Sequence, residues 1–296
     1  MQLKTAQDFD QELLILFDAY VHGTLDRRGF LDRAQKFAVG GMTAGMLLAA
    51  LSPDFARAQV VPKDDKRITT ERAEYPSTAG TGTVKGYLAK PANATGKLPV
   101  VLVVHENRGL NPHIEDIARR LALGNFVAFA PDALTPLGGY PGDEDKAREL
   151  FAKLDQKKAT EDFVAAANYL KSRPESSGKM GVVGFCYGGG MAHTLSVRMP
   201  ELNAAVPFYG NHPAAEDAVK VKAPLLIHFA GVDERINSAW PAYEAALKAA
   251  GTRYTAHQYA GTQHGFNNDT TPRFDATAAK LAWERTLAFF NAQLRA

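Results

Sequence analysis

The sequence has little cysteine and almost no net charge, and each of these features excludes a class of protein. One cysteine among 296 residues cannot form an internal disulfide, and no Cys-x-x-Cys or Cys/His zinc spacing is present. The 34 Lys and Arg residues nearly balance 32 Asp and Glu residues, so a net charge of +2 gives no indication of nucleic-acid binding. An apolar content of 46% and a charged content of 22% are ordinary for a globular protein, which excludes disordered and fibrous classes.

A long apolar run is also missing, and residues 1–58 have instead the layout of an export signal. The apolar run at residues 37–51 is Gly-rich and shorter than the roughly 20 residues of a membrane span, so stable membrane insertion is not expected. It lies between Arg27-Arg28 and the small-x-small site Ala56-Arg57-Ala58. This resembles a twin-arginine signal and predicts export to the periplasm, with cleavage after Ala58.

A second interpretation of the N-terminal segment stays open. Apolar residues from Phe9 to Tyr20 recur at helical spacing, and an unusually long acidic stretch precedes Arg27. Residues 1–50 would then be two helices that a cytoplasmic protein retains.

From Tyr75 onward, strand and helix signals alternate. Strands are expected at residues 83–89, 98–104, 126–130, 179–185, 204–209, 224–230 and 254–259, and helices at residues 111–123, 155–170, 188–198, 240–250 and 277–294. The alternation predicts an α/β fold with a mostly parallel central sheet and helices on both faces. No repeat or linker follows, so residues 59–296 are expected to form one domain.

Few reactive side chains directly follow a strand, and those at the carboxyl ends of parallel strands should gather in one crevice. They are His105, Glu106, Asp132, Cys186, Asp233 and His264. Cys186 lies in Gly184-Phe185-Cys186-Tyr187-Gly188, which matches a G-x-C-x-G nucleophile elbow. The helix that follows would point its N-terminus at the sulfur and favour the thiolate. Together these features indicate a nucleophile rather than a buried small side chain.

A thiol nucleophile needs a base and a group that orients the base. His264 follows the last strand in a flexible loop, and Asp233 follows the strand before it. The order nucleophile, acid, histidine is that of α/β-hydrolases. Asp132 precedes the nucleophile and is expected to be structural. The remaining histidines are expected to lie in strands or helices, or to lack a partner: His22, His113, His193, His212, His228 and His257.

An acyl-transfer site also needs donors for the developing oxyanion. The backbone N–H groups of Tyr187 and Asn107 are the candidates. Glu106 is either a solvated loop residue or an acid that accepts the thiol proton or positions the sulfur.

Taken together, six motifs resemble the dienelactone hydrolase family, the cysteine members of the α/β-hydrolase fold, over about residues 75–294. They are residues 105–111, 130–132, 184–189, 208–210, 231–233 and 261–266. The resemblance implies Cys186 as nucleophile, His264 as base, Asp233 as the residue that orients it, and Glu106 as an acid that interacts with the thiol. It also implies that Tyr209 lines the substrate pocket and that no metal or organic cofactor takes part.

The chain departs from the family where the substrate is bound. Dienelactone hydrolases hold a substrate carboxylate with two arginines, and Pro136 and Asn268 occupy those places here. Arg108, Arg235 and Arg273 lie near enough in the sequence to the site loops to bind an anionic group instead.

We therefore expect a hydrolase of small esters or lactones that acts through an acyl-enzyme. A thiol-redox protein using the same cysteine is an alternative, as is a non-catalytic binding module on the same fold. The oligomeric state and the identity and charge of the substrate do not follow from the sequence.

Overall fold

The computed structural model describes residues 4–55 and 59–295, which include one eight-stranded sheet. Its strand order is β1-β2-β4-β3-β5-β6-β7-β8. The pairs β1–β2 and β2–β4 are antiparallel and all the others are parallel, which confirms the mostly parallel sheet. The strands are β1 (Ile68–Ser77), β2 (Gly82–Pro91), β3 (Leu98–Val104), β4 (Val127–Pro131), β5 (Ser176–Phe185), β6 (Ala204–Phe208), β7 (Leu225–Val232) and β8 (Tyr254–Gln263).

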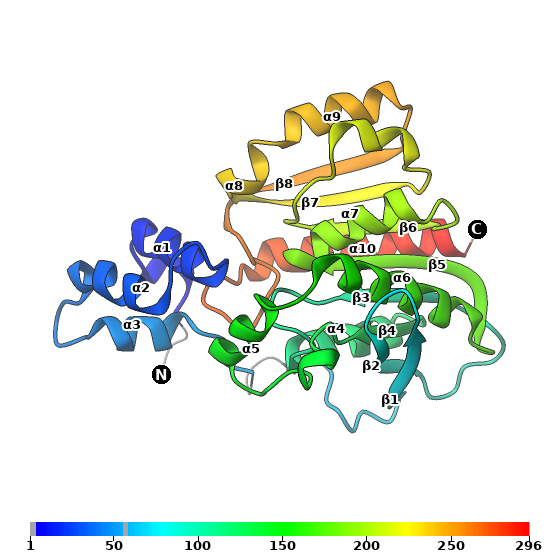
Figure 1. Ribbon diagram of the computed structural model, residues 1–296, viewed down its shortest axis with the longest axis horizontal. Coiled ribbons are helices and arrows are strands. Elements are labelled where there is room, and N and C mark those ends of the chain that lie inside the picture. Colours follow the sequence, from blue (N-terminus) through cyan, green and yellow to red (C-terminus); the bar gives the residue numbers. More distant parts are fainter. Residues whose placement is uncertain (1–3, 56–58, 296) are drawn as a thin grey trace.

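Helices cover both faces of this sheet (Figure 1). The helices after β2 are α4 (Pro112–Leu123), α5 (Glu144–Phe151), α6 (Gln156–Ser172), α7 (Tyr187–Arg198), α8 (Glu234–Asn237), α9 (Trp240–Ala249) and α10 (Ala276–Leu294). Apolar residues of α6, α7 and α9 pack on one face, and those of α4 and α10 pack on the other. The central strand β3 is consequently buried at all seven positions, as its unbroken apolar run predicts.

Each strand and helix expected after residue 75 is present, with shifted ends. Three of these strands and helices were not expected: the edge strand β1, the helix α5 and the short helix α8. Strand β1 carries exposed polar residues on much of its length, so it lacks the apolar run that identifies a buried strand.

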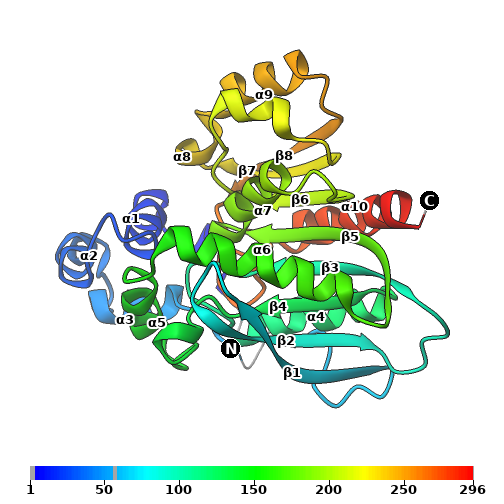
Figure 2. The ribbon, with the colours of Figure 1, turned by 45° about the vertical axis from the view of Figure 1, so that its right-hand side comes forward.

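The N-terminal segment contains three helices, α1 (Gln11–Val21), α2 (Arg27–Ala34) and α3 (Ala44–Leu51). They share a small hydrophobic core of their own, which includes Phe17, Tyr20, Phe30 and Leu47. In both ribbon views these blue helices lie together at one side of the molecule, beside α5 and near the carboxyl ends of the parallel strands (Figures 1 and 2). The N-terminal segment therefore lies next to the edge where the reactive side chains were expected.

The expected helix at residues 9–20 corresponds to α1. The cleavage site Ala56-Arg57-Ala58 lies outside the described residues, so export and cleavage stay predictions. Among the residues that the structure describes, every helix is too short or too polar to cross a membrane.

Candidate active site

Cys186 lies at a strained turn between β5 and α7. Its φ of 56° and ψ of −111° are unusual for a residue with a side chain. The turn is possible because Gly184 and Gly188 touch: a Cβ on Gly184 would lie 1.9 Å from the carbonyl oxygen of Gly188. The predicted elbow thus holds the thiol at the N-terminus of a 12-residue helix.

The loops after β7 and β8 bring Asp233 and His264 together. Nδ1 of His264 lies 2.6 Å from a carboxylate oxygen of Asp233, and both side chains are buried. This bond directs the other ring nitrogen, Nε2, away from the carboxylate, and Nε2 has no hydrogen-bond partner among the described residues. A ring nitrogen of His264 lies within 4.8 Å of Sγ of Cys186. The three residues predicted as nucleophile, acid and base are therefore neighbours in space.

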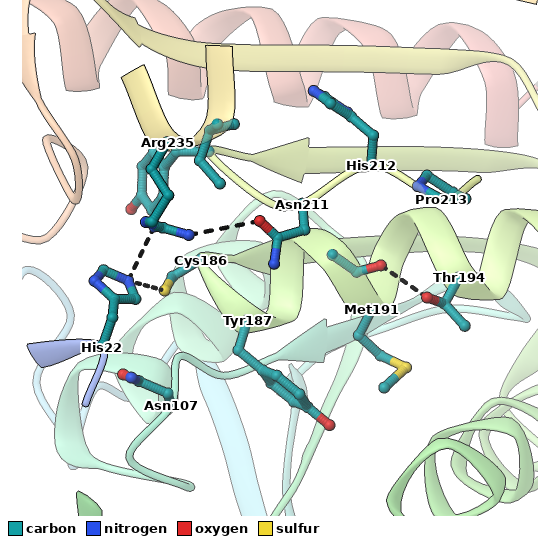
Figure 3. A pocket seen from close by; sticks show the side chains of 13 residues that line it. His22, Asn107, Cys186, Tyr187, Met191, Thr194, Asn211, His212, Pro213 and Arg235 are labelled. Carbon is teal, nitrogen blue, oxygen red and sulfur yellow. Dashed lines mark hydrogen bonds between the residues drawn. The ribbon is translucent and has the colours of Figure 1, made fainter. Parts of the chain in front are cut away.

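A second histidine, His22, also contacts the sulfur. Its Nε2 lies 3.2 Å from Sγ of Cys186, and Figure 3 shows its ring reaching the thiol from the N-terminal segment. The expectation that His22 lacks a partner was therefore wrong. The contact joins residues 164 positions apart, and the one local signal for it was Asp18, which precedes His22 by one helical turn.

The charges around the sulfur favour a thiolate. Burial acts to raise the pKa of the Cys186 thiol, but the charges of His22 and His264 outweigh it and lower the pKa to about 5. Burial acts to lower the pKa of His264, but the Cys186 charge and the bond to Asp233 raise it to about 10. Near neutral pH, the pair is consequently a thiolate beside an imidazolium.

The other predicted residues surround this pair. The buried Tyr209 ring lies 4.9 Å from the His264 ring, measured between centroids. The Tyr187 ring turns into the core and stacks on His105, leaving its backbone at the first turn of α7. Asn107 lines a cavity together with Cys186. Glu106 accepts a hydrogen bond of 2.8 Å from Nδ2 of Asn268 and lines a second cavity that includes Cys186.

The three candidate arginines have different environments. Arg273 pairs with Asp18 at 3.1 Å, and the buried Arg108 lies 3.6 Å from Glu144. Arg235 is more exposed, with 38% of its side chain accessible. It lines a cavity of about 360 Å³ next to Cys186 (Figure 3). Of the three, Arg235 is therefore the best placed to meet a ligand in that cavity.

Other polar residues have structural roles. Asp132 accepts hydrogen bonds from the backbone N–H groups of Leu110, Leu134 and Tyr140, which agrees with the structural role expected for it. Buried in β7, His228 contacts Tyr259 and Thr286. His113, for which no partner was expected, contacts Asp269 at 3.0 Å.

A soft transition metal could be held by Cys186, His22 and His264, whose donor atoms all lie within 4.8 Å of one another. However, Nη2 of Arg235 lies 3.1 Å from Nε2 of His22. This permanent positive charge disfavours a cation at the same point.

Comparison with known proteins agrees with this geometry. The family model described as "Dienelactone hydrolase family" matches residues 84–294, and a model described as "YqhI-like" matches residues 1–39. A "Putative carboxymethylenebutenolidase" of Escherichia coli is 31% identical over 247 residues, which cover 78% of this chain and 90% of that protein. A shorter relative, "Putative hydrolase fragment YghX" of Escherichia coli, is 54% identical over 114 residues, covering 38% of this chain and 97% of that one.

Solved structures show the same fold. The crystal structure of a "Putative Dienelactone Hydrolase" from Klebsiella pneumoniae has a TM-score of 0.67 and 29% identity, and covers 75% of this chain and 98% of that one. The family match, the relatives and the α/β-hydrolase fold lead to one conclusion. The chain belongs to the dienelactone hydrolase family, whose members are hydrolases of esters and lactones.

Proposed function

We propose that this hydrolase cleaves small carboxylic esters or lactones by nucleophilic attack of Cys186. The observation that carries the proposal is the position of the Cys186 sulfur, at a strained elbow beside the His264–Asp233 pair. A strained elbow exposes a nucleophile at the end of the sheet, and a histidine oriented by a carboxylate can move its proton.

In the proposed reaction, the thiol proton is already on His264 near neutral pH, and the thiolate of Cys186 attacks the carbonyl carbon. The backbone N–H groups of Tyr187 and Asn107 stabilise the oxyanion. The C–O bond then breaks, the leaving oxygen takes the proton from His264, and an acyl-enzyme remains on Cys186. His264 then takes a proton from a water molecule, which attacks the thioester, and the C–S bond breaks to release the acid and restore the thiolate beside the imidazolium.

Two residues are proposed to position the reactants. Glu106, held by Asn268, lines the cavity beside Cys186 and His264 and is proposed to hold the sulfur in position. Arg235 lines the 360 Å³ cavity with its guanidinium partly exposed, so it can bind an anionic group of a substrate. All three arginines lie near a carboxylate of the protein, but Arg108 and Arg273 are buried against theirs, whereas Arg235, 3.8 Å from Asp18, stays more exposed.

Mass spectrometry of the intact protein with a panel of lactones and aryl esters tests this function. We expect a mass gain equal to the acyl group, located on Cys186, and loss of both adduct and turnover in Cys186→Ala, by several orders of magnitude. Wild-type turnover of an aryl ester by Cys186→Ala would refute the assignment. A gain of one oxygen without any acyl adduct would support the thiol-redox alternative instead.

A further inference from the structure

The N-terminal segment places a second imidazole at the candidate nucleophile. His22 follows the last residue of α1, and its Nε2 lies 3.2 Å from Sγ of Cys186. Its ring meets that of His264 edge-on, with 4.7 Å between centroids. A cysteine–histidine–aspartate triad needs only one histidine. The second imidazole therefore has no role in the triad itself.

Asp18 holds His22 much as Asp233 holds His264. Nδ1 of His22 lies 2.8 Å from the backbone oxygen of Asp18 and 3.3 Å from its carboxylate. The same carboxylate pairs with Arg273 at 3.1 Å. Nδ1–H donates to Asp18, so Nε2 faces the sulfur, and it donates there in the positively charged imidazolium form, which carries a proton on both ring nitrogens.

Hydrogen bonds beside the site hold the end of α1 in place. The backbone oxygen of Val21 accepts from Nδ2 of Asn107 at 2.9 Å and from Nη2 of Arg108 at 3.2 Å. At the other end of the helix, the side chains of Gln11 and Gln263 are 2.7 Å apart. The loops that form the site thus also bind the helix that carries His22.

We infer that His22, oriented by Asp18, is a second catalytic histidine, which donates a hydrogen bond to the Cys186 thiolate and stabilises it before attack. The inference rests on the proposed role of Cys186 as nucleophile. The thiol proton is held by His264 and the S–H electron pair stays on sulfur, while His22 keeps the protons on both of its ring nitrogens throughout. The N-terminal segment is then a part of the active site.

Several other charged or titratable groups surround Cys186, and a test must separate His22 from them. They are Asp18 and Tyr20 from α1, Glu106 and Arg108 after β3, Glu144 and Asp145 in α5, Tyr187 in α7, Tyr209 and His212 after β6, Asp233 and Arg235 after β7, and His264 and Arg273 after β8. Single substitutions that leave all these groups in place are therefore needed.

The single cysteine makes a direct measurement possible, because alkylation by iodoacetamide reports on Cys186 alone. The rate of alkylation follows the thiolate fraction. We would measure it against pH by intact mass in the full chain, with EDTA present so that no metal occupies the cluster. His22→Gln removes the charge and keeps an amide donor. Asp18→Asn keeps His22 and weakens its orientation.

For His22→Gln we expect the midpoint of alkylation to rise by about one pH unit or more, because a neighbouring positive charge is lost. The acid limb of kcat/KM should rise with it. Asp18→Asn should shift the midpoint in the same direction by less. Two matched controls should keep the wild-type midpoint of alkylation. They are His257→Gln, in strand β8, and Asp32→Asn, on the exposed surface of α2.

His22→Ala allows a second test, which separates a chemical role of the imidazole from a role in stabilising the fold. Imidazole added to this variant should restore the low midpoint by occupying the space left in the cavity wall. An unchanged midpoint in His22→Gln, or failure of imidazole to restore it in a folded His22→Ala, would overturn the inference. Activity retained by Cys186→Ala would instead overturn the proposed function, so the two failures are distinguishable.

Discussion

At the scale of single residues, the site is a sulfur between two imidazoles. The Asp233 carboxylate holds His264, and the backbone oxygen and carboxylate of Asp18 hold His22. One opposite charge within about 4–6 Å can lower a thiol pKa by 1–3 units. Two such charges explain how a thiol that is only 8% exposed keeps a pKa of about 5. Burial by itself would have the opposite effect.

The pH dependence of kcat/KM follows from these shifts. The depressed pKa of Cys186 keeps the thiolate present until the pH falls to about 5, and the raised pKa of His264 keeps the imidazolium present until the pH rises to about 10. We expect a broad bell-shaped profile with its acid limb near 5. An acid limb near the ordinary thiol pKa of about 8.5 would contradict this charge arrangement.

Asp233→Asn should lower kcat by roughly 1,000-fold or more, because an amide can donate to Nδ1 and stabilise the wrong tautomer of His264. Asp275→Asn serves as a control, since Asp275 caps α10 away from the sulfur. Steady-state kinetics on an aryl ester, with circular dichroism to confirm folding, measures the effect. Equal losses in both variants would speak against an orienting role.

At the scale of elements, the junction between β5 and α7 depends on two backbones in contact. A Cβ on Gly184 would meet the Gly188 carbonyl, which is backbone and can move only if the helix moves. The same Cβ on Gly190, one turn into α7, would have nothing nearer than 3.5 Å. The two glycines therefore make a matched pair for testing the elbow.

Gly184→Ala should destabilise the protein by about 3 kcal/mol or more and abolish turnover, because the overlap displaces Cys186, the proposed nucleophile. Gly190→Ala should change the free energy of unfolding by less than about 1 kcal/mol. Urea unfolding followed by circular dichroism measures both. If Gly184→Ala unfolds at the wild-type urea concentration, the close contact at the elbow is not required.

At the scale of the whole molecule, the N-terminal segment is both a predicted export signal and the carrier of His22. Arg27, one of the paired arginines, bonds Asp145 of α5, and Arg148 of α5 lies over the Tyr20 ring at 4.5 Å. The segment thus contacts the catalytic domain at the site and at α5. Cleavage after Ala58 would remove all these contacts.

The N-terminus of the protein isolated from its native cell separates these possibilities. If residues 1–51 are part of the active site, we expect the active enzyme to begin at or near Met1. N-terminal peptide mapping by mass spectrometry, done on cytoplasmic and periplasmic fractions, measures this. An active periplasmic form that begins at Gln59 would support the export prediction and exclude a role for His22 in that form.

Much of the fold and part of the site could be predicted from local patterns. Apolar runs and their interruptions identified most strands, and Cys186, Asp233 and His264 stood directly after three of them. The polar edge strand β1 was missed because one of its faces is solvated. The partner of His22 was missed because no local pattern links it to a residue 164 positions away.

The sequence by itself determined that a thiol would stand at a strand-to-helix turn, since strand periodicity and the glycines around Cys186 act over a few residues. It also determined that Cys186, Asp233 and His264 follow three strands in that order. Only the tertiary structure decided that α1 lies against the site. That placement depends on the carbonyl of Val21 meeting the loop after β3 and on Asp18 meeting Arg273. Such contacts join distant segments through matching surfaces, which neighbouring residues in the sequence do not encode.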